Sequence, residues 1–440
     1  MTVDAFFDCI EGDLLAAWRR SDEIFALLRP EALFYRPIVW RHPFIFYLGH
    51  LPAFTWNQVH RGRPSANPYV DDIFSRGIDP DVDSGECHTH PEAPRRWPGV
   101  EAILRYRDGV RETVLEALDG SRVKPRDEER RRSFYIGLEH ELMHQETLLY
   151  MIYQLAPQRK IRPRDFSEDI FDAAPTSVEV TVPAGQARLG ACHDEFEYGW
   201  DNEFEAATVH VPAFKIGSLP VTIGDYHEFV ACGGYEERCY WTDSDWTWKT
   251  RENLHHPNFW FRERGSWFYR AMFDILPLSA VFSWPAYTSL AEARAYARWK
   301  KKRLLTEAEY HRSAFCRPDG SIEPYAWGTE APAPRHGNFN FIHWSPKPVG
   351  SHPDGISPWG IHELCGNGWE WTDTPFAPFP GFAPQETYPE YYADFFEGRH
   401  FVLKGASWAT AARLIRPSFR NWYQAHYPYV FAKFRCVSST

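Results

Sequence analysis

Two histidines four residues apart, His140 and His144, lie in a segment whose apolar residues recur at helical spacing. On a helix, this spacing places both imidazoles on one face, one turn apart. Two such nitrogens can bind one metal ion, and a third ligand must then come from elsewhere in the chain. The pair therefore predicts a metal site on a helix expected at about residues 127–155.

The same five residues also match the HExxH pattern of zinc peptidases, in which Glu141 would be the general base. The extended form of that pattern needs glycine three residues after the second histidine, where this chain has Thr147. A downstream ligand such as Glu168 falls in a predicted linker. A zinc peptidase and a buried histidine pair without metal are therefore two interpretations of these residues. A metal site completed by a third histidine is another.

The best candidate for a third ligand is His50, in the apolar segment Phe46–Pro52. A polar residue in such a stretch is expected to face the interior of a helical bundle, opposite His140 and His144. Three neutral imidazoles leave other coordination positions open, which suits Fe(II) chemistry with O2 and a substrate at the metal. His50, His140 and His144 are thus the predicted metal ligands.

The elements that must position these ligands are helices. Apolar spacing predicts four of them, from Thr2 or Asp4 to Leu28 and at 43–56, 97–118 and 127–155. The long Pro-, Gly- and Asp-rich stretch Gly62–Pro94 separates the second helix from the third. Four helices with one long crossover predict a bundle whose core can hold a metal.

Beyond this bundle, the predicted structure changes to short strands, many turns and dense aromatic residues. Val178–Val182 alternates like a strand, and helices are predicted at Leu290–Trp299 and Thr306–Ala314, capped by Ser289 and Thr306. Most of the remainder is predicted to be irregular loop with brief strands. We therefore expect an α+β protein of two domains, with the bundle at 1–155, a linker at 156–177 and the second domain at 178–440.

The composition excludes several classes of function. The net charge of −11 argues against nonspecific binding of nucleic acid, since no basic stripe is available to neutralise phosphates. No apolar run is long enough to span a membrane, and the N-terminus lacks the basic start of a secretory signal. Eight cysteines at irregular spacing are typical of reduced thiols. These features predict a cytoplasmic protein that binds neither nucleic acid nor membranes.

The second domain carries an ordered series of motifs, which is listed here: Val182–Gly185, Trp200–Glu203, Pro220–Thr222, Gly233–Tyr235, Lys302–Glu309, Gly366–Thr372, Phe419–Asn421 and Phe434–Arg435. On these motifs it resembles the formylglycine-generating-enzyme and sulfatase-modifying-factor family over about residues 178–440. The resemblance implies a C-type-lectin-like α+β fold. Formylglycine generation itself is not expected, because Ser407–Asn421 lacks the cysteine pair that this reaction needs.

The first domain resembles the DinB-like bundle that precedes such a domain in the sulfoxide synthases of ergothioneine and ovothiol biosynthesis. The resemblance implies non-haem Fe(II) bound by His50, His140 and His144. It also implies O2-dependent bonding of a chalcogen atom to the imidazole C2 of histidine or its trimethylbetaine, hercynine. The chain shows no methyltransferase domain, which favours hercynine. Glu141 and Gln145 flank the ligands and are expected to orient the imidazoles or to make ordinary surface contacts.

Several substrate-binding positions match or depart from the family pattern. Asn421 and Trp422 match the residues that contact the betaine end of hercynine. The glutamine that contacts the substrate imidazole is replaced by Met143. Two tyrosines, one of them a proton donor in the mycobacterial-type enzymes, are replaced by Phe376 and Phe379, which have no hydroxyl group.

The donor-binding positions differ as well. The Asp and Arg that bind γ-glutamylcysteine become Tyr423 and Tyr427, so charge-assisted bonds are replaced by flat aromatic surfaces. This resembles the selenoneine synthase branch, which joins hercynine to a selenosugar and gives a selenoxide. An ergothioneine-type synthase using cysteine or γ-glutamylcysteine is the alternative. Tyr69, Tyr423 and Tyr427 are the candidate proton donors.

Overall fold

A computed structural model describes residues 3–60, 63–65, 67–74, 78–80, 87–89, 97–122, 128–164, 166–168, 170, 175–384 and 395–440. The chain divides into two compact units, Met1–Asp165 and Phe166–Thr440. The division falls inside the segment 156–177 that the sequence analysis assigns to a linker. Each unit is described by itself.

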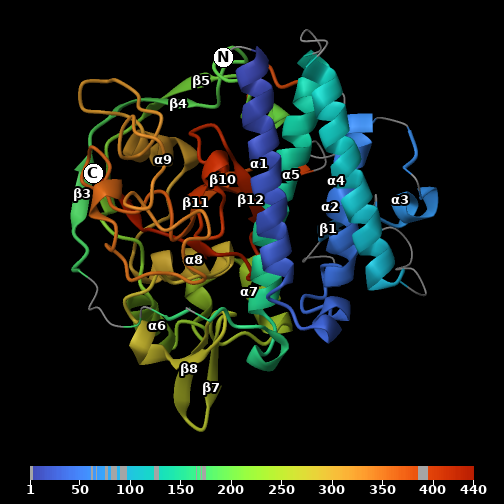
Figure 1. Ribbon diagram of the computed structural model, residues 1–440. Coiled ribbons are helices and arrows are strands. Elements are labelled where there is room, and N and C mark those ends of the chain that lie inside the picture. The colour runs from blue at the N-terminus through green and yellow to red at the C-terminus, as the bar shows by residue number, and fades with distance from the viewer. Residues whose placement is uncertain are drawn as a thin grey trace. The chain divides into compact units, whose positions relative to one another are not determined.

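Unit 1 is a bundle of four long helices (Figure 1), which are α1 (Val3–Phe25), α2 (Phe44–His60), α4 (Val100–Arg122) and α5 (Glu128–Tyr153). Helix α2 packs against both α4 and α5, and α1 packs against the same two helices. The prediction of four bundle helices is confirmed, with ends that differ by a few residues. Thr2, one predicted start of the first helix, lies outside the described residues.

The long crossover contains structure that was not predicted. It holds helix α3 (Pro68–Phe74) and the paired strands β1 (Ile78–Pro80) and β2 (Cys87–Thr89). The start of α3 is stabilised by Asn67, whose Oδ1 accepts from the amide of Val70 at 3.3 Å, and by Pro68 in the first turn. Buried side chains of α3 pack against α2.

Ion pairs join α1 to α4. Arg107 and Arg111 of α4 both contact Asp22 of α1, at 3.0 and 2.8 Å, and the Arg111 guanidinium lies 5.4 Å from the ring centre of Trp18. These contacts are partly exposed, so packing of apolar residues contributes more to the bundle than they do.

Unit 2 is built from small sheets and short helices around irregular segments. Its strands are β3 (Glu179–Val182), β4 (Gly185–Leu189), β5 (Ala207–Val211), β6 (Phe214–Gly217), β7 (Trp260–Glu263), β8 (Ser266–Arg270), β9 (Ile275–Pro277), β10 (Gly368–Pro375), β11 (His400–Ala406), β12 (Asn421–Gln424), β13 (Ala432–Lys433) and β14 (Val437–Ser439). Its largest sheet has the order β12-β11-β10-β13, in which only the β10–β13 pair is parallel. The predicted α+β class is confirmed.

The helices of unit 2 are α6 (Ile223–Ala231), α7 (Asp243–Arg251), α8 (Leu290–Trp299) and α9 (Glu307–Ala314). The predictions for α8 and α9 are confirmed with their caps, since the Ser289 and Thr306 side chains accept from backbone amides in the first turn. Helices α6 and α7 were not predicted from the sequence, which described most of the domain outside α8 and α9 as irregular.

Buried charges hold the main sheet together. Glu370 of β10 lies 3.2 Å from the Arg435 Nε and 3.6 Å from the Lys433 Nζ, and all three side chains are fully buried. Arg435 also donates to the carbonyls of Ser218, His362 and Glu363. Because each charge is paired and hydrogen-bonded, this network fixes strand order without leaving an isolated charge in the core.

Two further expectations concern the chain as a whole. Within the described ranges, no helix combines the length and apolar character that a membrane span requires. The seven cysteines that the structure describes are all free thiols, in line with the absence of a disulfide pattern in the sequence.

Candidate metal centre and substrate-binding residues

The three predicted ligands come together inside unit 1. One potential ligand atom each from His50, His140 and His144 lies within 4.8 Å of the others. His50 comes from α2, and the other two lie one turn apart on α5. Their ring centres are 5.1 Å apart for His50 and His140, 5.2 Å for His50 and His144, and 4.1 Å for His140 and His144. Side chains far apart in the sequence thus form one cluster.

Backbone carbonyls fix the tautomers of two of these rings. The His50 Nδ1 donates to the carbonyl of Phe74 at 2.7 Å, and the His144 Nδ1 donates to the carbonyl of His140 at 3.0 Å. A carbonyl can only accept, so each Nδ1 carries the proton and each Nε2 keeps its lone pair. This is the arrangement that metal-binding histidines use to orient the coordinating nitrogen.

Aromatic rings hold His140 and His50 in place. The ring of Phe54 stacks on His140 with centres 3.5 Å apart and planes 9° apart, and Phe46 stacks on His50 at 4.9 Å and 19°. The His140 Nδ1 is buried and has no hydrogen-bond partner in the described part of the chain. A buried polar atom of this kind calls for a partner, and a metal ion would provide one.

The charge state of the cluster also suits a metal. Burial lowers the pKa of His50 to about 4 and holds the pKa values of His140 and His144 well below the usual range. Repulsion from neighbouring imidazoles adds to this for His140 and His144, as does Arg41 for His144. The rings are therefore neutral at pH 7, as ligation requires. Three neutral imidazoles fit Fe(II), Zn(II) or Cu(II).

The stability of the metal-free protein is expected to fall as the pH drops from about 6.5 to 4. The unfolded chain takes up protons on these imidazoles below pH 6.5, whereas the folded chain does not, so the free energy of unfolding decreases. For His50, a pKa of about 4 instead of 6.5 corresponds to about 3 kcal/mol.

Thermal unfolding of the metal-free protein between pH 7.5 and 4 measures this effect. His50→Asn is the control, because it removes one titrating group and should flatten the profile. An identical profile in His50→Asn would contradict the prediction.

Two residues of α2 near His50 are unusual inside a helix. Pro52 lies within it, where a proline has no backbone N–H to donate to the carbonyl one turn earlier. At Gly49, an added Cβ would lie 2.4 Å from the buried ring of Phe74. Glycine therefore allows α3 to pack close enough for its last residue to accept from His50. Phe74 was missed in the sequence, where Asn67-Pro68 and the apolar residues that follow were the available signal.

Glu141 and Gln145 point to a different neighbour. The hydroxyl of Ser21 on α1 donates to the Glu141 Oε1, and the Gln145 Nε2 donates to the Ala17 carbonyl at 2.8 Å and to the Ser21 Oγ at 3.1 Å. Neither side chain hydrogen-bonds an imidazole of the cluster among the described residues. Both polar groups are thus engaged between α1 and α5, which does not support Glu141 as the base of a zinc peptidase.

The structure also describes three other residues considered for this site. Glu168 belongs to unit 2, where it accepts a hydrogen bond from Ser345. Tyr69 is on α3 and is 64% exposed, and no hydrogen bond or ring contact joins it to the three histidines in the described ranges. Met143 is half-buried on α5, directly before His144. The structure thus leaves the His50, His140 and His144 cluster as the candidate metal site.

In unit 2, residues predicted for the hercynine side lie on β12 and in the segment that follows β10. Phe376, which follows β10, stacks on Trp422 with ring centres 4.7 Å apart and planes 4° apart. The ring centre of Phe395 lies 5.7 Å from that of Trp422, and the two ring planes are tilted by 58°. The Asn421 Oδ1 accepts from the amide of Trp422 at 2.9 Å. The structure therefore brings Phe376 and Trp422 together, and Phe376 covers one face of the indole.

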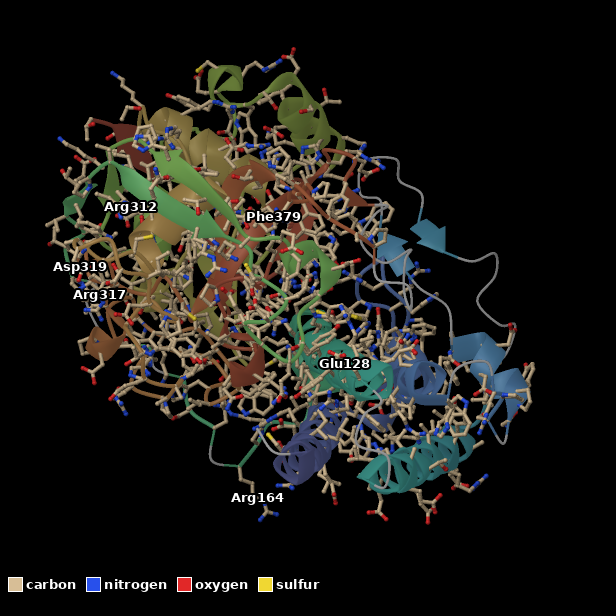
Figure 2. The ribbon with its side chains drawn as sticks, turned by 90° about the horizontal axis from the view of Figure 1, so that it is seen from above. Glu128, Arg164, Arg312, Arg317, Asp319 and Phe379 are labelled. Carbon is tan, nitrogen blue, oxygen red and sulfur yellow. The ribbon has the colours of Figure 1, made fainter. Side chains whose placement is uncertain are left out.

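Arg420 fixes the segment that carries Phe376 and Phe379, and Phe379 is labelled in Figure 2. The Arg420 guanidinium lies 4.9 Å from the ring centre of Phe376 and 4.3 Å from that of Phe379, and it donates to the carbonyl of Ala377 at 2.9 Å. Two further nitrogens bind the Glu307 carboxylate at 3.0 and 3.1 Å. The sequence analysis placed Arg420 in the motif Phe419–Asn421 but assigned it no role.

The two tyrosines predicted for the donor side also form a pair. Tyr423 and Tyr427 stack with ring centres 5.2 Å apart and planes 11° apart, and Tyr429 meets the edge of Tyr427 at 5.2 Å. Tyr423 is half-buried, whereas Tyr427 is 1% exposed. Tyr423 therefore provides the accessible ring and Tyr427 lies beneath it.

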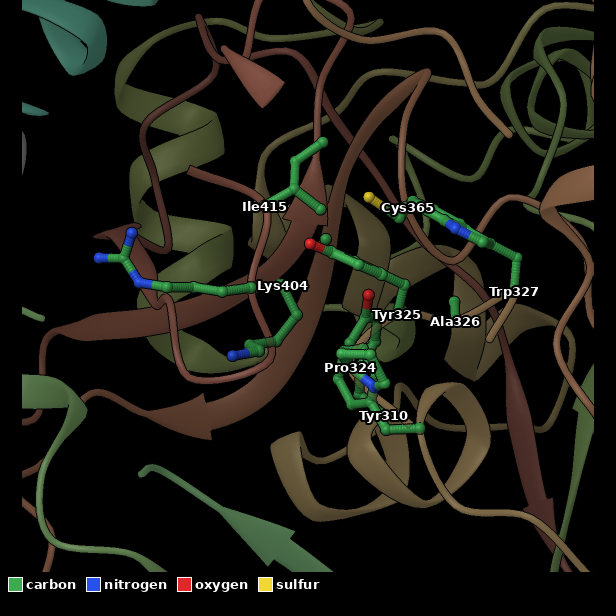
Figure 3. A pocket seen from close by; sticks show the side chains of 11 residues that line it. Tyr310, Pro324, Tyr325, Ala326, Trp327, Cys365, Lys404 and Ile415 are labelled. Carbon is green, nitrogen blue, oxygen red and sulfur yellow. The ribbon is translucent and has the colours of Figure 1, made fainter. Parts of the chain in front are cut away.

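A cavity elsewhere in unit 2 involves none of these residues (Figure 3). It has about 280 Å³ of empty volume, including space open to solvent, and its lining residues include Tyr310, Tyr325, Trp327, Cys365 and Lys404. Burial lowers the pKa of Lys404 to about 8, and its ammonium donates to the carbonyls of Pro417 and Phe419. This cavity is not part of the candidate site.

Comparison with known proteins assigns a family to each unit. The model of the sulfatase-modifying factor enzyme 1-like domain matches residues 167–440, and the model of the DinB superfamily matches residues 13–148. Both agree with the resemblances seen in the sequence motifs.

Three curated relatives cover most of the chain. A hercynine oxygenase of Mycolicibacterium thermoresistibile is 36% identical over 350 residues, which cover 77% of this chain and 75% of the relative. The ergothioneine biosynthesis protein 1 of Neurospora crassa is 31% identical and covers 97% of this chain, and that of Schizosaccharomyces pombe is 30% identical and covers 94%. The chain spans 57% and 54% of these two fungal proteins. With these matches over both units, the chain belongs to the hercynine oxygenase family of ergothioneine-type sulfoxide synthases.

Proposed function

We propose that this protein binds Fe(II) through His50, His140 and His144 and uses O2 to join a chalcogen atom to the imidazole C2 of hercynine. The observation that carries the proposal is the cluster of three neutral imidazoles, whose potential ligand atoms lie within 4.8 Å of one another. Iron bound there supplies the activation of O2. The names of the relatives, hercynine oxygenase and ergothioneine biosynthesis protein, support the choice of substrate.

The overall reaction is balanced without a further reductant. The C2–H bond of hercynine and the chalcogen–H bond of the donor break, and a carbon–chalcogen bond forms. One oxygen atom of O2 remains on the chalcogen as a sulfoxide or selenoxide, and the other leaves as water. The two hydrogens released by the substrates are those found in the water, so the protein must move protons but supplies no electrons.

Trp422 and Asn421 are the proposed contacts for the betaine end of hercynine. An aromatic face attracts a trimethylammonium group by about 0.5–2 kcal/mol. Phe376 occupies one face of the indole at 4.7 Å, so the ammonium is assigned to the other side. Met143 is the proposed apolar neighbour of the substrate imidazole.

The proposed proton donor is a tyrosine, because Phe376 and Phe379 have no hydroxyl group. Of the three candidates, Tyr423 is half-buried and stacked, Tyr427 is buried beneath it, and Tyr69 is exposed. A partly desolvated hydroxyl with access to substrate suits this role best, which favours Tyr423.

Two donors each have an observation in their favour. The names of the relatives support a sulfur donor, as in an ergothioneine-type synthase, more directly than the selenosugar expected from the sequence. The stacked rings of Tyr423 and Tyr427 favour a selenosugar, because aromatic faces bind sugars and lack the charges that a zwitterionic peptide needs.

A donor screen tests the proposal. Iron-loaded protein is supplied with hercynine, O2 and one donor at a time: cysteine, γ-glutamylcysteine, a 1-thiosugar or a 1-selenosugar. We expect O2 uptake and a hercynine adduct in mass spectra with at least one of them, and no adduct without iron or O2. Absence of an adduct with every donor would refute the proposed function, and peptide cleavage under anaerobic conditions would favour a zinc peptidase instead.

A further inference from the structure

A buried histidine–carboxylate pair lies next to the stacked tyrosines in unit 2. The His426 Nε2 and the Asp245 Oδ1 are 2.9 Å apart, and both side chains are more than nine-tenths buried. His426 follows β12, whereas Asp245 belongs to α7, so the pair joins two elements that are 181 residues apart in the sequence. Neither residue was singled out from the sequence.

Helix α7 holds His426 from two sides. Trp248 lies one turn after Asp245, and its ring stacks on His426 with centres 4.7 Å apart and planes 5° apart. The helix is itself fixed at its start, where the Thr242 side chain accepts from the amide of Asp245. His426 is therefore restrained both in the plane of its ring and along one hydrogen bond.

His426 lies in the turn that follows β12 and leads to Tyr427. The amide of Tyr427 donates to the carbonyl of Gln424 at 3.1 Å, which closes the turn, and the Ala425 carbonyl accepts from the amide of Ala291 at 3.1 Å. Directly after His426, the ring of Tyr427 lies beneath Tyr423. The position of His426 thus determines where the turn places Tyr427.

We propose that His426, held by Asp245 and Trp248, is a positioning residue that sets the Tyr423 and Tyr427 stack as a binding surface for the chalcogen donor. The proposal rests on the proposed function, which assigns these tyrosines to the donor. A directional bond at a buried position is well suited to this task, because apolar packing alone would fill the space without fixing the rotation of the turn. The ligand class is an uncharged or weakly charged donor with a flat apolar face, such as a chalcogen sugar.

The charges around the pair are few. Burial raises the pKa of the Asp245 carboxyl, but hydrogen bonds from His426 and Thr242, together with the charge of Arg294 on α8, hold that pKa below the usual range. Arg294 is itself paired with Asp373. Asp245 is therefore a carboxylate at neutral pH, and it can hold His426 in one orientation.

The test compares variants in the iron-loaded full chain. His426→Phe keeps the stack on Trp248 but loses the bond to Asp245, and His426→Gln keeps a donor for it. We expect His426→Phe to raise the KM for the chalcogen donor by about tenfold. The KM for hercynine and the affinity for iron should change less than about twofold, and His426→Gln should restore most of the donor affinity. If His426→Phe does not fold, Asp245 is changed instead, and loss of its acceptor oxygen should act in the same direction, whereas Asp245→Asn keeps an acceptor and should have a smaller effect.

His227→Phe is the matched control, since His227 is a partly buried histidine of α6 that also contacts aromatic rings. An unchanged donor KM in His426→Phe, or in a folded variant of Asp245 that lacks the acceptor oxygen, would overturn the inference, as would an equal rise in the KM for hercynine.

A second readout is independent of turnover. In protein labelled with 3-fluorotyrosine, the ¹⁹F resonances of Tyr423 and Tyr427, assigned with Tyr→Phe variants, should shift in His426→Phe and remain in place in His227→Phe. If wild-type protein forms no adduct with any donor, the proposed function fails. Unmoved tyrosine resonances would overturn the positioning role by themselves.

Discussion

Replacing His140 with alanine is expected to weaken Fe(II) binding by more than about 100-fold, beyond the ~10–100-fold loss typical of removing only an orienting partner. His140 provides one of three potential ligand atoms, and the two that remain cannot enclose the ion. Turnover with any donor should be lost with the metal. Anaerobic Fe(II) titration, metal analysis of the purified protein and the adduct assay measure these effects together.

His60→Ala is the matched control for this experiment. His60 ends α2, the helix that also carries His50, and it lies outside the cluster. Its ring contacts that of Trp56, with centres 4.2 Å apart and planes tilted by 31°. The His60→Ala variant should retain iron at wild-type affinity, because His60 is not one of the three potential ligands. Full retention of iron by His140→Ala, or equal loss of iron in both variants, would contradict the assignment of the metal site.

The cluster of three histidines could be predicted because the sequence patterns that indicate it are local and periodic. His140 and His144 sit at helical spacing, and His50 interrupts an apolar helix, so burial of the apolar faces brings the three together. Phe74 could not be predicted in the same way. Its carbonyl reaches His50 only because Gly49 lacks a side chain and α3 packs closely, and both conditions depend on tertiary structure.

The sequence also could not show which neighbour the Glu141 side chain contacts. In the sequence, it stands between two ligand positions and fits a zinc-peptidase base. On the helix, it lies about 100° around the axis from His140, where Ser21 of α1 donates to it. Which helix occupies that side is decided by packing of the bundle, which the local pattern does not encode.

In unit 2, capping residues predicted α8 and α9, whereas α7 was missed because its buried residues are mostly polar. Asp245 and Lys249 face inward along with Trp248, so the helix lacks the apolar period that identifies others. The same polar burial produces the contact between Asp245 and His426. The residues that made α7 hard to recognise are thus the ones to which the positioning role is assigned.

Replacing Arg420 with alanine is expected to destabilise unit 2 by about 3–5 kcal/mol, the usual cost of leaving a buried charge without its partner. Arg420 and Glu307 have only 2% and 3% of their side chains exposed, and their contact is bidentate. Urea unfolding followed by tryptophan fluorescence, with hydrogen exchange to locate the change in unit 2, measures the effect.

Two comparisons separate the buried charge from other causes. The double variant Glu307→Met with Arg420→Met should be less destabilised than Arg420→Ala, because no charge is left unpaired. Arg294→Ala breaks an ion pair in which Asp373 is 40% exposed. Loss of this ion pair should lower the free energy of unfolding by less than about 1 kcal/mol.

Replacing Arg420 with alanine should also affect the residues proposed to bind hercynine. Arg420 holds the carbonyl of Ala377 and lies against Phe376 and Phe379, so its loss should speed hydrogen exchange in residues 376–379 and release the ring that covers Trp422. The double variant should keep the fold but still lacks the contacts of Arg420 with Ala377, Phe376 and Phe379. The KM for hercynine should therefore rise while the affinity for iron stays the same. A double variant with wild-type exchange in 376–379 would show that Arg420 stabilises the fold without positioning the substrate-binding segment.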